Sequence, residues 1–271
     1  MIRLTPLTVL LVVIAPHACG EIRLLAVTSS ASFVQGVPAP GSLATAFCTG
    51  LTGFDGILTA SAPLPFSLAG VQVSVGGKPA PILALANLGG YQQINFQVPW
   101  EASSNGEIAV ALGSDRGTLI PPVNLRWDVL FVDAAGSIVA QHASDYRPVT
   151  TLDPARPGEW IITYATNLGA VDHTPATGFP ALADPLSPLH SPYDTFTPLL
   201  SGQSLTTNYM GLAPGMVGLY QINVRMPDTF SGVTPNLMIQ KVRDCGFFFD
   251  PLCGRGVTIT TSLPATLPVK P

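Results

Sequence analysis

Two heptapeptides decide the fold: Gln93-Ile-Asn-Phe-Gln-Val-Pro99 and Gln221-Ile-Asn-Val-Arg-Met-Pro227. Apolar and polar side chains alternate along each of them, which is typical of a β-strand with one buried face, and a proline then ends the strand. Asn95 and Asn223 hold the same position in the two copies. We therefore expect them to share a structural role, such as a hydrogen bond to a neighbouring turn.

A second matched pair precedes the heptapeptides in the same order. Its members are Ala39-Pro-Gly-Ser-Leu-Ala-Thr-Ala-Phe-Cys-Thr-Gly-Leu51 and Arg156-Pro-Gly-Glu-Trp-Ile-Ile-Thr-Tyr-Ala-Thr-Asn-Leu168. In each, a Pro-Gly turn leads into a strand with β-branched and aromatic residues. The strand ends at Gly50 or Asn167, residue types that tolerate the positive φ of a tight turn. The two halves of the chain are thus an internal repeat.

Short strands separated by turn residues account for much of the remaining chain. Turn signals such as Gly76-Gly77-Lys78-Pro79 and Asp133-Ala-Ala-Gly136 recur at short spacing, without the helical stretches that a parallel α/β fold needs. We therefore predict an all-β chain of two tandem β-sandwich domains. The further predicted strands are residues 71–75, 108–112, 125–132, 237–242 and 257–261.

Length and charge limit the organisation and the partners. The 271 residues suffice for two domains, which we place at residues 21–130 and 131–271, after a signal peptide at residues 1–20. Residues 174–198, rich in Pro, Ala and Ser, are predicted to form a long surface loop of the second domain. Charged residues make up 10% of the chain, the net charge is −4 and basic residues do not cluster, which argues against nucleic acid as a partner.

The N-terminal residues predict export. Arg3 precedes an apolar run at residues 7–15, and the small residues before Glu21 favour cleavage after Gly20. Cys19 leaves a second interpretation open, in which a lipid is attached to this cysteine after cleavage. No later stretch has the ~20 apolar residues that a membrane span requires. We expect a secreted or cell-surface bacterial protein with no transmembrane segment in its mature form.

The cysteines after the signal peptide are odd in number, so at least one thiol stays free. Cys245 and Cys253 are separated by a short segment with Gly and Pro turn residues, and an oxidising compartment favours a disulfide between them. Cys48 lies in an apolar strand, where we expect a buried structural thiol.

The predicted disulfide closes a loop that carries Phe247, Phe248 and Phe249. Three adjacent aromatic side chains cannot all point to one side of a strand. Either the rings pack against their own domain or they form a contact surface. These three residues are the candidate binding site that the sequence offers.

Several motifs together resemble a known family. They are Pro40-Gly41-Ser42, the segment Leu68-Ala-Gly-Val-Gln-Val-Ser-Val-Gly-Gly-Lys-Pro-Ala-Pro81, both heptapeptides and the preceding Gly211-Leu-Ala-Pro-Gly-Met-Val-Gly-Leu-Tyr220. In these motifs the chain is similar to the Solibacter-type C-terminal domain of soil acidobacteria, a family of unknown function. The resemblance covers nearly all of the chain after the signal peptide. It implies an exported, immunoglobulin-like double module, and it supplies no catalytic residues.

Catalytic and metal-binding motifs do not occur in the sequence. His142, His173 and His190 are isolated from one another, and neither HExxH, paired CxxC, Gly-x-Ser-x-Gly nor a nucleotide-binding loop is present. We interpret Asp172-His173 as part of a solvated loop and Asp133 as a turn residue rather than a calcium ligand. The sequence therefore predicts no cofactor, no metal site and no enzyme.

The function hypotheses belong to different classes. The favoured one is a non-catalytic binding or structural module at the bacterial cell surface or in the extracellular space, whose partner is an unknown protein or polysaccharide surface. A hydrolytic enzyme would need a site assembled from residues distant in sequence, in one cleft. A retention or sorting module is a further alternative.

Overall fold

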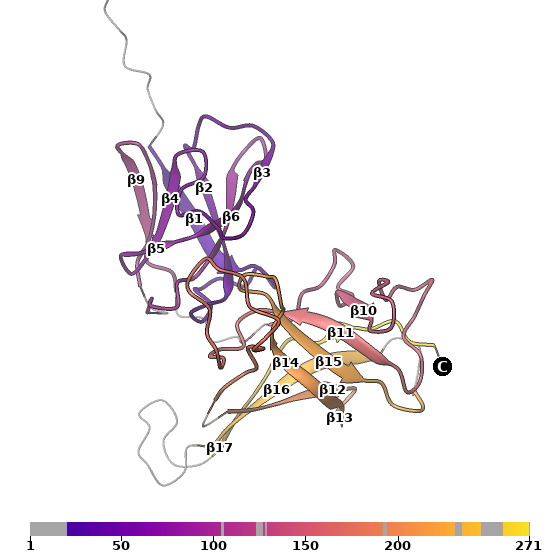
Figure 1. Cartoon of the computed structure of the whole chain (residues 1–271). Coiled ribbons are helices and arrows are strands. Elements are labelled where there is room, and N and C mark those ends of the chain that lie inside the picture. Colours follow the sequence, from indigo (N-terminus) through magenta and orange to yellow (C-terminus); the bar gives the residue numbers. More distant parts are fainter. Residues whose placement is uncertain are drawn as a thin grey trace, which may run out of the picture.

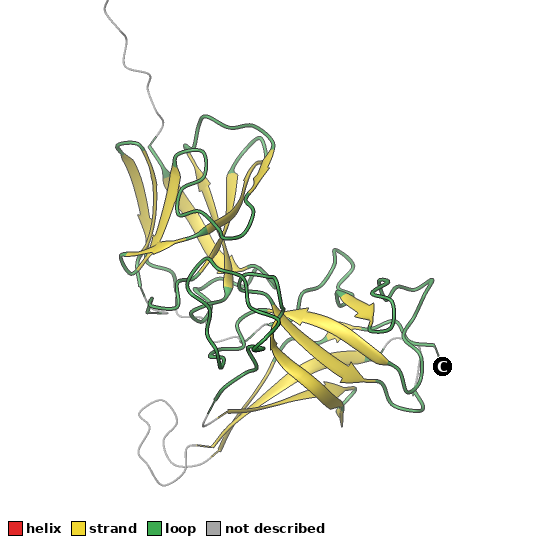
Figure 2. Cartoon of the chain, in the orientation of Figure 1, coloured by secondary structure: helices red, strands yellow, loops and turns green. Residues whose placement is uncertain are grey.

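The computed structural model describes residues 21–103, 106–122, 127, 129–191, 194–230, 235–244 and 257–270. The regular elements in this part of the chain are β-strands, and no helix occurs among them (Figure 2). The strands form two bodies that meet at one end, the first coloured indigo to purple and the second pink to yellow (Figure 1).

The first body is a sandwich of two antiparallel sheets. One sheet has the strand order β1-β2-β7-β6-β3, and the facing sheet has the order β5-β4-β8-β9. Its strands are β1 (Arg23–Ser29), β2 (Leu43–Thr49), β3 (Ile57–Thr59), β4 (Val71–Val75), β5 (Lys78–Ala80), β6 (Ile82–Asn87), β7 (Gln92–Gln97), β8 (Ile108–Leu112) and β9 (Asp115–Leu119).

The second body repeats this plan. One sheet has the order β10-β11-β15-β14, and the other has the order β13-β12-β16-β17, with β18 also paired to β16. Its strands are β10 (Ala140–His142), β11 (Trp160–Ala165), β12 (Asp194–Leu200), β13 (Gln203–Ser204), β14 (Thr206–Leu212), β15 (Tyr220–Arg225), β16 (Asn236–Asp244), β17 (Val257–Thr261) and β18 (Ala265–Thr266).

Both bodies are immunoglobulin-like sandwiches, so the predicted fold class is confirmed. Each has strands in the ABED order of that fold, extended by β3 in the first sandwich, against a CFG sheet extended by one C′ strand. The repeated sequences form the same strand pair in the same register. Leu43 pairs with Gln97 and Thr45 with Asn95, as Trp160 pairs with Arg225 and Ile162 with Asn223.

Each sandwich buries its own hydrophobic core. The predicted alternation holds, since Ile94 and Phe96 are fully buried in the first core and Ile222 and Val224 in the second. Strands end where the turn chemistry predicted: Gly50 and Asn167 have φ values of 92° and 65°. These left-handed conformations stop the ladder in both copies.

The two repeat asparagines have a different partner from the one expected. Gln93 Nε2 donates to Asn95 Oδ1 at 2.8 Å, and Gln221 Nε2 donates to Asn223 Oδ1 at 2.9 Å. The bond joins side chains two residues apart on one strand rather than reaching a neighbouring turn, because residues i and i+2 of a strand share a face.

Two predicted segments differ in the structure. The predicted loop at residues 174–198 ends early, since β12 begins at Asp194 and pairs with β16 along its length. This strand was not predicted because Pro198 lies within it, and a proline argues against a strand. The missing N–H of Pro198 does not prevent its neighbours from pairing. Of the predicted strand at 125–132, residues 125, 126 and 128 lie outside the described residues, and residues 129–132 make only isolated bridges, because Asp133 turns the chain back toward Ser137.

Candidate functional site

The two sandwiches are joined by hydrogen bonds between residues far apart in sequence. Asn167 Oδ1 accepts from the Ala39 N–H at 2.7 Å, and the Asn167 N–H donates to Ser42 Oγ at 3.0 Å. Beside them, Thr166 Oγ1 accepts from the Leu43 N–H at 2.9 Å. Ser42 and Thr166 are fully buried. The end of β11 is therefore fixed to the turn that leads into β2.

A loop of the second sandwich makes a second set of contacts. Residues 169–191 lie between the two bodies (Figure 1). Gly178 donates its N–H to Gln97 Oε1 at 2.8 Å and accepts from the Leu64 N–H at the same distance. Thr177 Oγ1 accepts from the Trp100 N–H at 3.1 Å. The loop that the sequence placed on the surface of one domain thus bridges both.

Close packing supports these bonds. Trp100, which follows β7, packs against the core of the second sandwich. Its indole covers Gly41 so closely that a Cβ on that glycine would lie 2.1 Å from Trp100 Cη2. Tyr220 is fully buried nearby, and this burial raises the pKa of its hydroxyl. The Trp100 Nε1 is buried without a hydrogen-bond partner among the described residues, but Ser42, Thr166 and Gln97 are buried with theirs. These bonds hold one geometry, because moving the bodies apart would leave their groups unpaired.

The fixed joint creates a groove of about 880 Å³. Its floor is the outer face of the sheet formed by β5, β4, β8 and β9, and its end wall combines residues of the first sandwich with residues of the bridging loop of the second. The lining residues include Gln72, Ser74, Ala109 and Ala111 on the floor, Lys78 and Arg116 toward the sheet edges, and Phe66, Glu101, Ala176 and Thr177 on the wall.

Small side chains make this surface hollow. Ala109 and Ala111 pair with Ser74 and Gln72 across β8 and β4, so no large side chain rises from the middle of the floor. The polar groups at the rim are partly engaged: Arg116 lies 3.5 Å from Glu107. A hollow of small side chains with a few convergent polar groups is typical of a binding surface.

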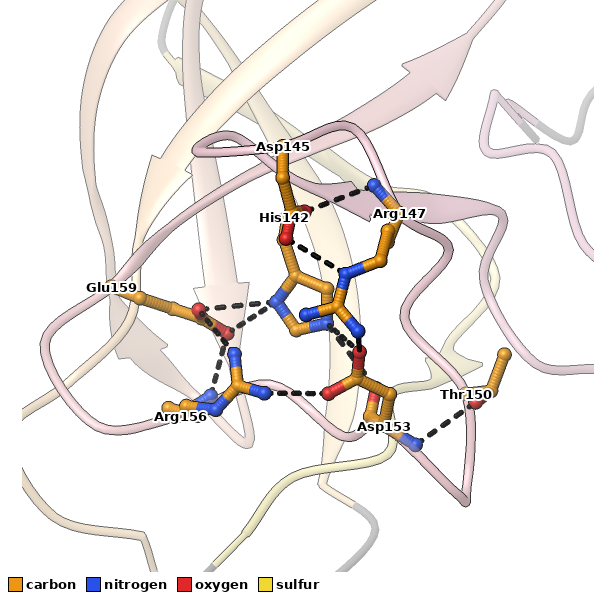
Figure 3. Close-up of polar contacts among 7 residues, drawn as sticks. All are labelled: His142, Asp145, Arg147, Thr150, Asp153, Arg156 and Glu159. Carbon is orange, nitrogen blue, oxygen red and sulfur yellow. Dashed lines mark hydrogen bonds and ion pairs between the residues drawn. The ribbon is translucent and has the colours of Figure 1, made fainter.

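A separate charged cluster lies at the far end of the second sandwich (Figure 3). The His142 side chain, fully buried on β10, stands between two acids: its Nδ1 is 3.1 Å from both carboxylate oxygens of Glu159, and its Nε2 is 3.6 Å from Asp153 Oδ2. Two arginines form ion pairs with Asp153: Arg147 at 2.8 Å and Arg156 at 2.6 Å.

The cluster has the properties of a structural clamp. Both carboxylates beside His142 also contact an arginine, and Asp145 pairs with Arg147 at 2.7 Å, which lowers the pKa of that carboxyl. The contacts tie the loop between β10 and β11 to both strands. In the described part of the chain, no group of three or more His, Cys, Asp or Glu side chains is arranged to hold a metal ion.

The other residues singled out in the sequence have ordinary structural roles. Asp133 Oδ1 accepts from the N–H groups of Ala135 and Ser137, so the turn interpretation is confirmed. Asp172 pairs at 2.8 Å with His190 rather than with its neighbour His173. Cys48 is a buried free thiol as predicted, and burial raises its pKa to about 12.

The predicted contact loop lies outside the described residues. This holds for Phe247, Phe248 and Phe249, for the Cys245–Cys253 disulfide and for the signal peptide at residues 1–20 with Cys19. All of these stay predictions.

Comparisons with known proteins add little to this description. No family model and no curated protein matches the chain. Among solved structures, the I9–I11 tandem of titin is similar at 10% identity and a TM-score of 0.22, over 89% of this chain and 65% of that one. The tandem Ig repeats of Dlar align at 11% identity, with 92% and 98% of the two chains covered and a TM-score of 0.20. Titin Z1Z2 in complex with telethonin aligns at 10% identity, with 91% and 97% coverage and a TM-score of 0.19.

The described strands, joint and groove are consistent with a non-catalytic binding or structural module. The described residues include no helix that is long and apolar enough to cross a membrane. Sequence reasoning missed the joint and the groove. One sequence signal could have indicated the joint: residue type changes from neutral to charged at matched repeat positions. Ser42 and Gln97 in the first copy correspond to Glu159 and Arg225 in the second.

Proposed function

We propose that this protein is an exported, non-catalytic binding module that holds an extended segment of a partner protein in the groove between its two sandwiches. The observation that carries the proposal is the groove of about 880 Å³, whose floor comes from the first sandwich and whose wall is completed by Ala176 and Thr177 of the second. Extended segments bind well to surfaces that are formed in advance, because less conformational freedom is lost on binding.

The side chains of the groove suit a peptide. Phe66 is 48% exposed and offers an aromatic wall, while Gln72 and Ser74 supply hydrogen-bonding groups on the floor. Lys78 and Arg116 add positive charge near the two edges of the sheet. A segment with small or apolar residues at its centre and acidic residues at its ends would complement this surface.

A groove-filling variant tests the proposal. The probe is a phage-displayed library of random linear peptides, selected on the full chain. Ala111→Phe places a ring on the hollow floor and should reduce binding of the selected peptides by at least about tenfold, which is 1.4 kcal/mol. Ala135→Phe adds the same ring to an exposed turn of the second sandwich and should leave binding unchanged. Equal binding to both variants would reject the groove.

Export has its own test. The signal-peptide pattern at residues 1–20 and the resemblance to the Solibacter-type family support it. The intact mass of protein collected outside expressing cells should correspond to a chain that begins at Glu21. A lipid-sized increase on a chain that begins at Cys19 would indicate a membrane-anchored form, and retention of the full-length chain inside the cells would contradict export.

A further inference from the structure

The two sandwiches share a turn that their sequences do not reveal. After β1, the Phe33 N–H donates to the Ser29 carbonyl at 3.0 Å, and after β10, the Tyr146 N–H donates to the His142 carbonyl at 2.9 Å. In each turn, the side chain of the residue before the aromatic accepts a hydrogen bond from the N–H of the residue after the aromatic. Ser32 accepts from Val34, and Asp145 accepts from Arg147. Phe33 and Tyr146 are therefore equivalent, and the aromatic ring is the feature that the two turns share.

Both aromatic residues occupy a backbone conformation that disfavours them. Phe33 has a φ of 56° and Tyr146 a φ of 59°, in the left-handed region where glycine is the favoured residue. Their side chains do not compensate by burial, since Phe33 is 56% exposed and Tyr146 is 65% exposed. Strained backbone that presents an exposed side chain is more typical of a functional surface than of a structural turn.

Further groups surround the first ring. Its centroid lies 6.2 Å from that of Phe47 on β2, and Tyr91 lies 5.8 Å beyond Phe47. The planes are inclined by 44° and 66°, so the three rings form a twisted surface rather than a flat one. Beside them lie the amides of Gln93 and Asn95, on the outer face of β7.

The second sandwich repeats most of this surface. Tyr164 on β11 holds the position of Phe47 in the repeat. Gln221 and Asn223 repeat the amide pair. Tyr164 also donates to Gln141 Oε1 at 2.6 Å. We refer to these two surfaces, around Phe33 and Tyr146, as the aromatic platforms.

Each amide pair retains hydrogen-bonding capacity. The glutamine nitrogen donates to the asparagine oxygen, which leaves the Gln Oε1 acceptor and the Asn Nδ2 donors free of hydrogen bonds within the described residues. The rings and amides of the platforms carry no charge. They offer apolar faces next to one acceptor and one donor, and this arrangement occurs twice in one chain.

We infer that the aromatic platforms bind a soluble, neutral polysaccharide. A sugar ring has an apolar C–H face that packs on an aromatic side chain, and its hydroxyl groups both donate and accept, as the free amide groups require. Two like platforms on sandwiches held by a fixed joint suit a ligand that itself repeats, and occupying both gives avidity. The twisted arrangement of the rings fits a single chain rather than a flat crystalline surface.

The test uses the full chain in native gels that contain hydroxyethyl cellulose, galactomannan or dextran. At least one of these polymers should retard the wild-type protein. Phe33→Gly and Tyr146→Gly should each weaken that interaction about tenfold or more, and the double variant should abolish it. Because glycine suits a positive φ, melting temperatures should not fall, which separates a binding role from a structural one.

Two controls define the result. Ser201→Gly makes the same backbone change at a φ of 48°, and Phe179→Ala removes a ring that is 51% exposed elsewhere. Both should retain binding. No retardation of the wild type by any of the three polymers would overturn the inference, as would retained binding by the double variant. Loss of polysaccharide binding in Ala111→Phe alone would assign the ligand to the groove and equally overturn it.

Discussion

The Pro-Gly turn that leads into β2 and the one that leads into β11 have opposite surroundings. At the first turn, Gly41 is covered by the Trp100 indole, Ser42 is buried against Asn167, and Gln97 reaches both Gly41 and Gly178. Each of these side chains is uncharged. The end of the first sandwich is thus an interior surface.

The second turn faces solvent. Gly158 is equivalent to Gly41, and its neighbours are Arg225 and Asp228, which pair at 2.8 Å and are 43% and 78% exposed at their side chains. Glu159, at the position of Ser42, contacts His142. The two turns have the same backbone but different residues. The turn covered by the other sandwich carries neutral side chains, and the turn that no other described residues cover carries charged ones. Covered charges would need partners, whereas exposed charges are solvated.

The largest expected difference between the two ends concerns the glycines. Gly41→Ala should lower the free energy of unfolding by about 3 kcal/mol or more, because a positive φ of 82° is combined with a severe clash against Trp100. Gly158→Ala should cost about 1 to 2 kcal/mol, since its nearest contact is 3.2 Å away. Urea unfolding of both variants measures this, and equal losses would show that the joint is not packed as described.

The residues that follow the two heptapeptides, Trp100 and Asp228, should give a smaller difference in stability when each is replaced by alanine. Trp100→Ala removes a ring that packs on the second core and should cost about 3 kcal/mol. Asp228→Ala removes one partner of an exposed ion pair and should change stability by less than about 0.5 kcal/mol. Thermal unfolding of the two variants distinguishes these values. A Trp100→Ala variant as stable as Asp228→Ala would mean that the bodies separate freely in solution.

The third-largest difference in stability is expected at the buried side-chain amide of Gln97. Gln97→Leu leaves the Gly178 N–H without its acceptor and should cost about 2 kcal/mol, together with faster amide exchange at Gly178. Arg225→Leu, at the equivalent position, should change stability by less than about 1 kcal/mol. If the two variants exchanged equally slowly at Gly178, the bridging loop would be held by other contacts.

The smallest predicted effect is a difference in acid stability. The pair at the outer end of β4 and β8 is apolar, Val71 with Leu112, whereas β12 and β16 are longer and end in the charged pair of Asp194 with Arg243. Hydrogen bonding to Arg243 lowers the pKa of Asp194. This pair therefore contributes stability above an unfolded pKa of ~3.9, and the contribution, about 1 kcal/mol, is lost as the pH falls through the lower folded value.

Asp194→Asn tests this difference. The variant should be less stable than the wild type at pH 7, and the two should converge near pH 2 in urea titrations. A constant difference across that range would show that the carboxylate charge is not involved.

Much of the fold could be predicted from the sequence, because the repeated heptapeptides carry both the strand pattern and its end signals. The turn glycines and Asn167 were equally readable. The joint was not, since its bonds link positions such as Ala39 and Asn167 that no local pattern connects. The aromatic platforms were missed for a similar reason: Phe33 and Tyr146 lie in segments of unlike sequence that only their backbone hydrogen bonds show to be equivalent.

Amide hydrogen exchange across the joint tests the central claim most directly. The N–H groups of Ala39, Leu43, Asn167 and Gly178 each donate to a residue of the other sandwich or its loop. If the sandwiches form one fixed unit, these amides should exchange as slowly as core strand amides such as that of Ile94. Exchange as fast as in exposed turns, while Ile94 stays protected, would show a flexible hinge and contradict the account of the groove.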